Sequence, residues 1–264
     1  MRHRLSVLVR LTRLAALMLG LCLSALCLGA SPVLDRVVEQ GVLKVAMTGE
    51  QQPFNFVFSK TDTLIGFDVD LAQALAGIMK VRLEISRMPF DRLLSALSEG
   101  EVDMVISGMT ITAERTRKAS FVGPYMLSGK SMLTTETAVK QLKGSTEFNS
   151  PEVRLAALKG STSERYVQRS LPQARLTTVA NYDEGVKLLL AGKVDGMVAD
   201  MPILALTKRR YPNSGLHMIT PPLDTEPLGI AIASGDEQLE NLLRNYLAAL
   251  EETGLLVSLH KKWF

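Results

Sequence analysis

The sequence predicts an α/β protein of two lobes, each built around a doubly wound sheet, from three observations. Short apolar runs rich in β-branched residues alternate with segments whose apolar residues recur at helical spacing, a pattern typical of strands joined by crossover helices. The alternation occurs over residues 42–106 and begins again over 154–199. The halves also share an internal repeat, because LSEGEVDMV at 97–105 matches LLAGKVDGM at 189–197 with leucine, glycine, valine and aspartate in register.

The first unit contains predicted strands at 42–47, 81–85 and 102–106, with amphipathic helices between them. The last of these strands is short and apolar, which suits burial on both faces. Asp68 and Asp70 lie in the first turn of the first helix, where the helix dipole favours acidic side chains. The order of elements is that of a doubly wound sheet.

The second unit repeats this order, with predicted strands at 154–158, 176–179 and 194–199 and helices at 163–169 and 182–191. A C-terminal tail follows, with a strand at 228–233 and a long helix at 236–252. The tail is too small to fold alone, so we expect it to return to the first lobe and cover its sheet. Two crossing segments, near Leu127–Leu133 and Ile219–Leu228, would join the lobes. The expected division is residues 31–130 plus 224–264 for lobe 1 and 131–223 for lobe 2.

The N-terminus has the three regions of a secretory signal peptide, assigned to residues 1–30. Four arginines precede an uncharged apolar run, Leu14–Leu28, that ends in small residues. An uncleaved membrane anchor is the alternative, because the run approaches the ~17-residue lower limit for spanning a bilayer. We favour cleavage near residues 29–30, which implies a periplasmic protein. Cys22 and Cys27 both lie in this segment, so the cleaved chain would have no disulfide and no cysteine nucleophile.

Removal of the signal peptide changes the charge balance of the chain. The segment carries four of the 30 basic residues and none of the 27 acidic ones, which leaves 26 against 27 and a net charge near −1. No basic stripe remains, which argues against a nucleic-acid partner.

The segment ISGMTITAER at 106–115 has the features of a ligand site. It follows a buried strand and opens a helix, and its small residues let backbone groups approach a ligand closely. Thr112 is the expected N-cap. Arg115 then lies in the first turn, where the positive end of the helix dipole disfavours a cation unless an anion lies nearby. The alternative is that Arg115 belongs to a solvated charged face with Glu114 and Arg117.

The internal repeat places Gly108 and Asp200 at equivalent positions just past equivalent strands. Ligands of open α/β sheets bind beyond the carboxyl ends of the strands, so two lobes that face each other through those ends would form a ligand cleft. Asp200 also has an ordinary interpretation, since an aspartate at a strand end is often a solvated turn residue.

Motifs spread over nearly the whole remaining chain occur in one order: GFDVDLA at 66–72, GMTIT at 108–112 with Glu114 and Arg115, Phe121 with Pro124 and Tyr125, KGST at 159–162, GKVD at 192–195 with Asp200, EPLGIA at 226–231, and Gly254-Leu255 with KWF at 262–264. With these motifs the chain resembles the family 3 periplasmic solute-binding proteins, the amino-acid receptors of ABC importers. The resemblance implies the two-lobed type II periplasmic-binding-protein fold with a hinge of two crossing segments. It also implies a monomer that delivers an amino acid to a cognate ABC permease in the inner membrane, without a cofactor or metal.

The resemblance further implies roles for individual residues. Arg115 would bind the α-carboxylate of the ligand, helped by backbone N–H groups of the turn at Ser161 and Thr162. A guanidinium fork and a helix N-terminus both suit that task. The ammonium group would be held by Asp200, the Gly108 carbonyl and the Thr110 hydroxyl.

Thr48, Gln51 and Phe90 are the predicted contacts to the ligand side chain. Many relatives have an aromatic residue at the position of Gln51, and those that select cationic amino acids often have an acid at the position of Thr48. The residues found here indicate a polar or neutral amino acid. Phe54 is expected in the core, and Lys159 is expected to be an exposed lysine.

Two other function classes remain open. Periplasmic cyclohexadienyl dehydratases share this fold, and an enzyme of that kind would need an acid or base in the cleft, for which Glu226 is the nearest candidate. His217 and His260 are both expected at the surface. A sensor ectodomain would require a separate signalling partner.

Overall fold

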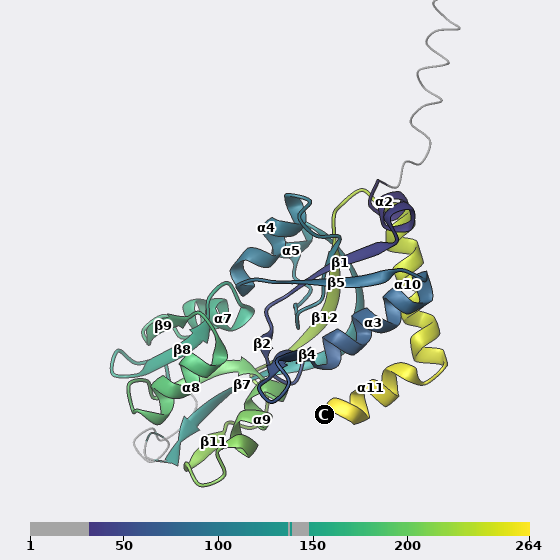
Figure 1. Ribbon diagram of the computed structural model, residues 1–264. Helices are drawn as coiled ribbons and strands as arrows, with labels where there is room; N and C mark the ends of the chain where they lie inside the picture. The colour runs from purple at the N-terminus through teal and green to yellow at the C-terminus, as the bar shows by residue number, and fades with distance from the viewer. Residues whose placement is uncertain (1–31, 137, 139–147) are drawn as a thin grey trace, which may run out of the picture.

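The computed structural model describes residues 32–136, 138 and 148–264, so the predicted signal peptide lies outside it. Within the described part, no helix is long and apolar enough to cross a membrane. The chain forms two α/β lobes, and the long strands β7 (Ser120–Thr135) and β12 (Asp224–Ile232) run from one lobe into the other (Figure 1).

The first lobe has three parallel strands in the order β5-β1-β6, with β1 at Val42–Met47, β5 at Arg82–Arg87 and β6 at Met104–Val105. The first strand in the chain thus lies between the second and the third, as in doubly wound sheets. Helices α3 (Phe67–Met79) and α4 (Leu93–Ser98) connect the strands.

The second lobe repeats this order as β9-β8-β10, with β8 at Arg154–Leu158, β9 at Arg175–Val179 and β10 at Gly196–Asp200. Its connecting helices are α7 (Thr162–Ser170) and α8 (Tyr182–Leu190). The fold class predicted from the sequence is therefore confirmed. One difference is that the two sheets share β7 and form a single hydrogen-bonded path.

The internal repeat has the same structural role in both lobes. The Asp103 carboxylate accepts a hydrogen bond from the backbone N–H of Lys44 at 2.8 Å. The Asp195 carboxylate accepts one from the N–H of Arg154 at 2.8 Å. Each aspartate thereby ties the turn before the third strand of its lobe to the first strand.

Strands β7 and β12 form the hinge. They pair antiparallel as far as Lys130, which lies opposite Asp224 of β12 and also opposite Asp200 of β10. Lys130 therefore marks the point where β7 passes between the lobes. The sequence predicted a shorter crossing segment, near Leu127–Leu133. Gly123, Pro124 and Gly129 interrupt the apolar pattern of β7, which conceals its full length. The boundaries at 130/131 and 223/224 stay a prediction, since β7 crosses the first of them without a break.

The remaining elements are α2 (Pro32–Gln40), β2 (Glu50–Gln51), β3 (Asn55–Phe58), β4 (Thr63–Ile65), the 3-10 helix η2 (Phe90–Arg92), α5 (Ala113–Thr116), α9 (Met201–Arg210), β11 (Leu216–Met218), α10 (Glu237–Glu252) and α11 (Leu255–Trp263). Strands β2, β3 and β4 form a small separate sheet. Helices α2 and α9 were not predicted from the sequence.

The C-terminal tail returns to the first lobe, as predicted, and α10 and α11 lie along α3 (Figure 1). The Trp263 indole N–H donates to Asp70 at 2.7 Å, and the Phe264 ring lies 5.6 Å from that of Phe67.

His217 is exposed, as expected. The expectation that His260 is a surface residue is wrong, because its ring is partly buried 4.9 Å from Phe67.

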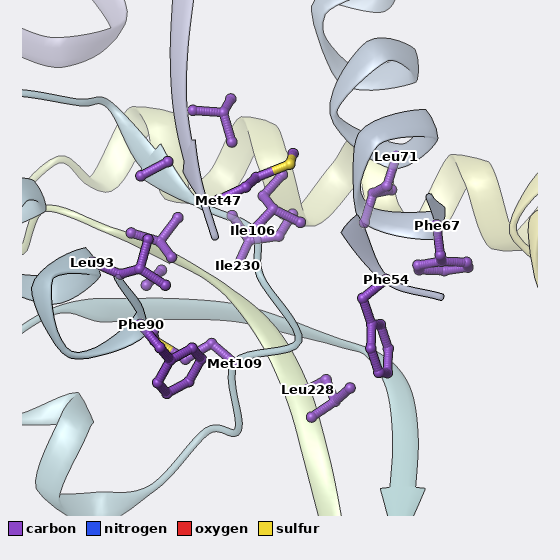
Figure 2. Close-up of a cluster of buried hydrophobic side chains, with 14 of the residues drawn as sticks. Met47, Phe54, Phe67, Leu71, Phe90, Leu93, Ile106, Met109, Leu228 and Ile230 are labelled. Carbon is purple, nitrogen blue, oxygen red and sulfur yellow. The ribbon is translucent and has the colours of Figure 1, made fainter. Parts of the chain in front are cut away.

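The apolar core of the first lobe extends to the predicted ligand site (Figure 2). Phe54 is fully buried, which confirms its place in the core. Met109 follows the site glycine and is also buried, so the core anchors the loop beside it. Phe90 is buried at the edge of this core, near the N-terminus of α4.

Candidate functional site

Arg115 lies between the lobes and does not belong to a solvated face. Its backbone N–H donates to the Thr112 hydroxyl at 3.2 Å, so Thr112 is the N-cap of α5, as predicted. The guanidinium is only 3% exposed and donates to the Thr110 carbonyl at 2.9 Å and to the Gly160 carbonyl of the second lobe at 3.2 Å. It also lies 5.4 Å from the centre of the Phe90 ring. The buried cation therefore contacts backbone groups of both lobes.

Burial, and then the nearby positive charge of Arg165, lower the pKa of Arg115 to about 10. The guanidinium still carries its charge at neutral pH. A buried cation with these contacts is suited to a ligand carboxylate, which would compensate it.

The loop that holds Gly108 is anchored by a buried carboxylate. Gly108 has a φ of 52°, and its N–H donates to Asp68 at 2.9 Å. Asp68 also accepts hydrogen bonds from the Asn55 amide at 2.8 Å and the Tyr125 hydroxyl at 3.1 Å. Burial, partly offset by these hydrogen bonds, raises the pKa of Asp68 to about 6. The sequence indicated only a helix first-turn residue here, whereas Asp68 is the shared acceptor beneath the site.

Thr110 and Thr162 meet from opposite lobes at the carboxylate of Glu226. The Thr110 hydroxyl donates to Glu226 at 3.2 Å and the Thr162 hydroxyl donates to the same oxygen at 3.0 Å. The other Glu226 oxygen is ion-paired with the Lys130 ammonium. Glu226 therefore lies at the site, although the sequence did not include it among the ligand contacts.

Asp200 ends β10 and is 6% exposed, so it is not a solvated turn residue. Its Oδ1 is buried and has no hydrogen-bond partner among the described residues. Burial, followed by the negative charge of Glu226, raises the pKa of Asp200 to about 7, while Lys130 and Arg115 oppose this rise. A buried, unpaired carboxylate oxygen is a favourable contact for a ligand cation.

Gln51 connects the predicted side-chain pocket to the second lobe. Its carbonyl oxygen accepts from the Ser107 hydroxyl at 2.6 Å and the Thr48 hydroxyl at 3.2 Å. Tyr182 of α8 lines the same cavity as Gln51. Thr48, Gln51 and Phe90 line one cavity of about 10 Å³, together with Glu50, Pro89, Leu158, Ala180, Asn181 and Tyr182. A cavity of this size holds about one water molecule, so the closed side-chain pocket is too small for an amino-acid side chain.

Two ion pairs join the lobes at the rim. Lys159 contacts Asp91 at 2.8 Å, and Arg165 contacts Glu114 at 2.6 Å. Lys159 is exposed, as expected from the sequence. Because solvent screens charges at the rim, these pairs align the closed lobes without holding them shut.

The structure therefore brings all nine predicted site residues to one region between the lobes, with Ser161 as the N-cap of α7. The sequence did not identify Asp68, Lys130 or Tyr182. Lys130 carried a signal, because it is a lone charge in the otherwise uncharged run YMLSGKSML. Tyr182 follows a strand of the second unit, where ligands of such sheets bind. Among the described residues, no group of three or more His, Cys, Asp or Glu could hold a metal ion.

Gly160 allows the two lobes to approach closely, because it has no Cβ that would meet Asp91 of the first lobe. It has a φ of 74°, and a Cβ there would lie 3.0 Å from the Asp91 Cβ. Gly192 has a φ of 64° with nothing within 4 Å of such a Cβ, which makes it a matched control. Alanine at either position should lower stability by roughly 1–2 kcal/mol through backbone strain. Only Gly160→Ala is expected to weaken ligand binding as well, by about tenfold, measured by calorimetry. Equal affinities of the two variants would contradict a closing contact at Gly160.

The sequence pattern that defines the bacterial extracellular solute-binding proteins, family 3, matches residues 43–264. The chain belongs to this family. This family 3 protein is 28% identical over 230 residues to a cyclohexadienyl dehydratase of Pseudomonas aeruginosa, covering 87% of this chain and 85% of the relative. It is 26% identical over 232 residues to the L-cystine-binding protein TcyJ of Escherichia coli, covering 88% and 86%.

Solved structures give the same result for the fold. The ancestral amino acid-binding protein AncCDT-1, a precursor of cyclohexadienyl dehydratase, matches with a TM-score of 0.81 and 35% identity over 88% of this chain and 99% of that one. An ancestral arginine-binding protein bound to arginine matches with a TM-score of 0.77 and 30% identity, covering 85% and 98%. The family resemblance and the two-lobed type II fold are thus confirmed.

Proposed function

We propose that this family 3 protein is a periplasmic, monomeric receptor that captures a polar or neutral amino acid between its lobes and delivers it to an ABC-transporter permease. The observation that carries the proposal is the pair of buried, oppositely charged side chains, Arg115 and Asp200, contributed to one site by different lobes. The unpaired Asp200 oxygen supports this assignment. Such a pair complements the two charged ends of an amino acid.

At the carboxylate end, Arg115 would act with the N-terminus of α7. The Ser161 hydroxyl accepts a hydrogen bond from the Glu164 backbone N–H at 3.1 Å and so caps this helix. Other backbone N–H groups of the turn, including that of Thr162, would then be available to the ligand carboxylate. At the ammonium end, Asp200 would act with the Gly108 carbonyl and the Thr110 hydroxyl. Thr110 would exchange its present bond to Glu226 for one to the ligand.

The side-chain pocket supports a neutral ligand. Thr48, Gln51 and Tyr182 supply neutral hydrogen-bonding groups, and Phe90 and Leu158 supply apolar surface. The acidic residue that lines this cavity, Glu50, is exposed. A cationic side chain would therefore lack a buried partner for its charge, which would weaken its binding.

The direct test is a thermal-shift screen of the protein without its signal peptide against the standard amino acids. At least one amino acid should raise the melting temperature in a concentration-dependent way, since a ligand at 100 times its Kd stabilises by about 2.7 kcal/mol. No shift with any amino acid would refute the proposal.

Binding should release a proton near neutral pH. Asp200, whose pKa is raised to about 7, faces Glu226, Lys130 and Arg115, and its charge also acts on Tyr182. A ligand ammonium would favour ionised Asp200, so protonation competes with binding and affinity falls as pH drops below 7. The expected slope approaches about tenfold per pH unit. Calorimetry at pH 5 to 8 measures it, with Asp200→Asn as the control that loses the slope. A constant affinity over this range would contradict the role of Asp200.

A second function is favoured by one observation. Asp200 and Glu226 are two buried carboxyl groups that interact electrostatically, and a carboxyl with a pKa of about 7 suits general acid catalysis. The relative from Pseudomonas aeruginosa is a cyclohexadienyl dehydratase. Incubation with prephenate or arogenate tests this alternative. Consumption of either, lost in Glu226→Gln, would support the enzyme; no consumption together with amino-acid binding would support the receptor.

A further inference from the structure

Lys130 and Glu226 form a buried ion pair across the two hinge strands. Lys130 is 1% exposed and Glu226 is 6% exposed. Strand register places Lys130 directly opposite Asp200, and side chains of directly opposed residues lie on the same face of a sheet. We call Lys130, Asp200 and Glu226 the hinge cluster. The cluster and Arg115 interact electrostatically, so these four charges share one environment.

Charge balance restricts what can bind in this environment. A buried charge is costly unless an opposite charge compensates it. A bound ligand ammonium keeps Asp200 ionised, and in that state Arg115 and Lys130 balance Asp200 and Glu226. A zwitterion adds one charge of each sign and keeps the balance, whereas a ligand with an extra charge leaves one charge uncompensated between closed lobes.

We propose that the Lys130–Glu226 pair determines the net charge of the ligand that the closed site accepts, and sets it at zero. The inference rests on the proposed function and deepens it. Glu226 alone would add a negative charge to the site and favour cationic ligands. Lys130 cancels that charge while it also donates to the Thr162 hydroxyl at 3.3 Å. The pair is thus a specificity determinant supplied by the hinge, separate from the side-chain pocket.

The test uses Lys130→Met, Glu226→Gln and the double variant, with glutamine, lysine and glutamate as probes of similar length and different charge. Lys130→Met should shift the affinity ratio of lysine to glutamine upward by at least about tenfold. Glu226→Gln should shift the ratio of glutamate to glutamine upward by a similar factor. The double variant should return to the wild-type order, because its site is again balanced.

The matched control is the rim pair of Lys159 and Asp91, which crosses the same lobes but has an exposed lysine. Lys159→Met and Asp91→Asn should leave the ratios within about threefold, because solvent screens exposed charges. Equal ratios in the hinge and rim variants would overturn the inference.

If a single variant is unstable, its melting temperature is measured with each of the three probes. The probe whose charge compensates the substitution should raise the melting temperature of that variant more than the other two probes do. An equal rise with all three, or no rescue by the compensating probe, would overturn the inference. If the wild-type protein binds no amino acid at all, the proposed function fails instead, so the two failures are distinguishable.

Discussion

Arg115→Ala is expected to weaken amino-acid binding strongly while the protein stays folded. The guanidinium is buried between the lobes, and its removal would leave a ligand carboxylate desolvated and unpaired. Loss of one partner of a buried, hydrogen-bonded charge pair costs about 2–5 kcal/mol, which corresponds to roughly 30-fold to several thousandfold in affinity. Isothermal titration calorimetry with the amino acid found in the thermal-shift screen measures the loss.

Arg117→Ala is the matched control, because Arg117 ends the same short helix and is exposed. It should change affinity little, apart from a weak dependence on salt. Arg115→Lys should recover only part of the binding, since an ammonium cannot offer a bidentate fork. Retained affinity in Arg115→Ala would show that the carboxylate binds elsewhere. A lost cooperative unfolding transition would show instead that Arg115 is needed for folding.

Asp68→Ala is expected to cause the largest loss of stability among these changes. It would leave three buried donors without their acceptor, namely Asn55, Tyr125 and the Gly108 N–H. Each unsatisfied buried group costs about 1–3 kcal/mol, so the three together correspond to a loss of roughly 3–9 kcal/mol. Affinity should fall too, because the loop that carries Gly108 loses its anchor. Urea denaturation measures the stability, and calorimetry measures the affinity.

Asp183→Ala is the control for Asp68→Ala, since Asp183 also lies in the first turn of a helix but is exposed. It should cost less than about 1 kcal/mol. A loss in Asp68→Ala no larger than that would contradict the role of Asp68 as a shared acceptor.

Asp68 should also affect how stability depends on pH. Its pKa in the folded protein, about 6, is above the unfolded value of 3.8, so folding favours the protonated carboxyl. Its contribution to the free energy of unfolding therefore falls as pH rises from 4 to 6. Asp68→Asn should flatten that part of the profile, measured by urea denaturation at several pH values. An unchanged profile would show that Asp68 does not titrate in this range.

The parts of the fold that could be predicted depend on local signals. Helix α10 has apolar residues at helical spacing, and Thr112 precedes α5 as an N-cap. Strand β7 could not be predicted at full length, because Gly and Pro in its sequence argue against a strand that only pairing with β12 stabilises. Helix α9 has a local start signal, Pro202 in its first turn, which is typical of helix N-termini.

The candidate site could be predicted in part. Arg115 and Asp200 follow strands of the two units, and the rule that ligands bind at the carboxyl ends of strands places both in one cleft. Their ligand roles stay predictions until a ligand is measured. Lys130 and Glu226 could not be paired from the sequence, because 96 residues separate them.

By itself, the sequence determined the α/β class, the repeated unit and the family, because periodicity and motif order are properties of the chain. Only the tertiary structure decided which charges are buried and with whom they pair. Asp68 lies 57 residues before its partner Tyr125, and Lys130 meets Asp200 only through the pairing of β7 with β10. Burial and pairing set pKa values and the charge of the site, and both arise from contacts between distant segments.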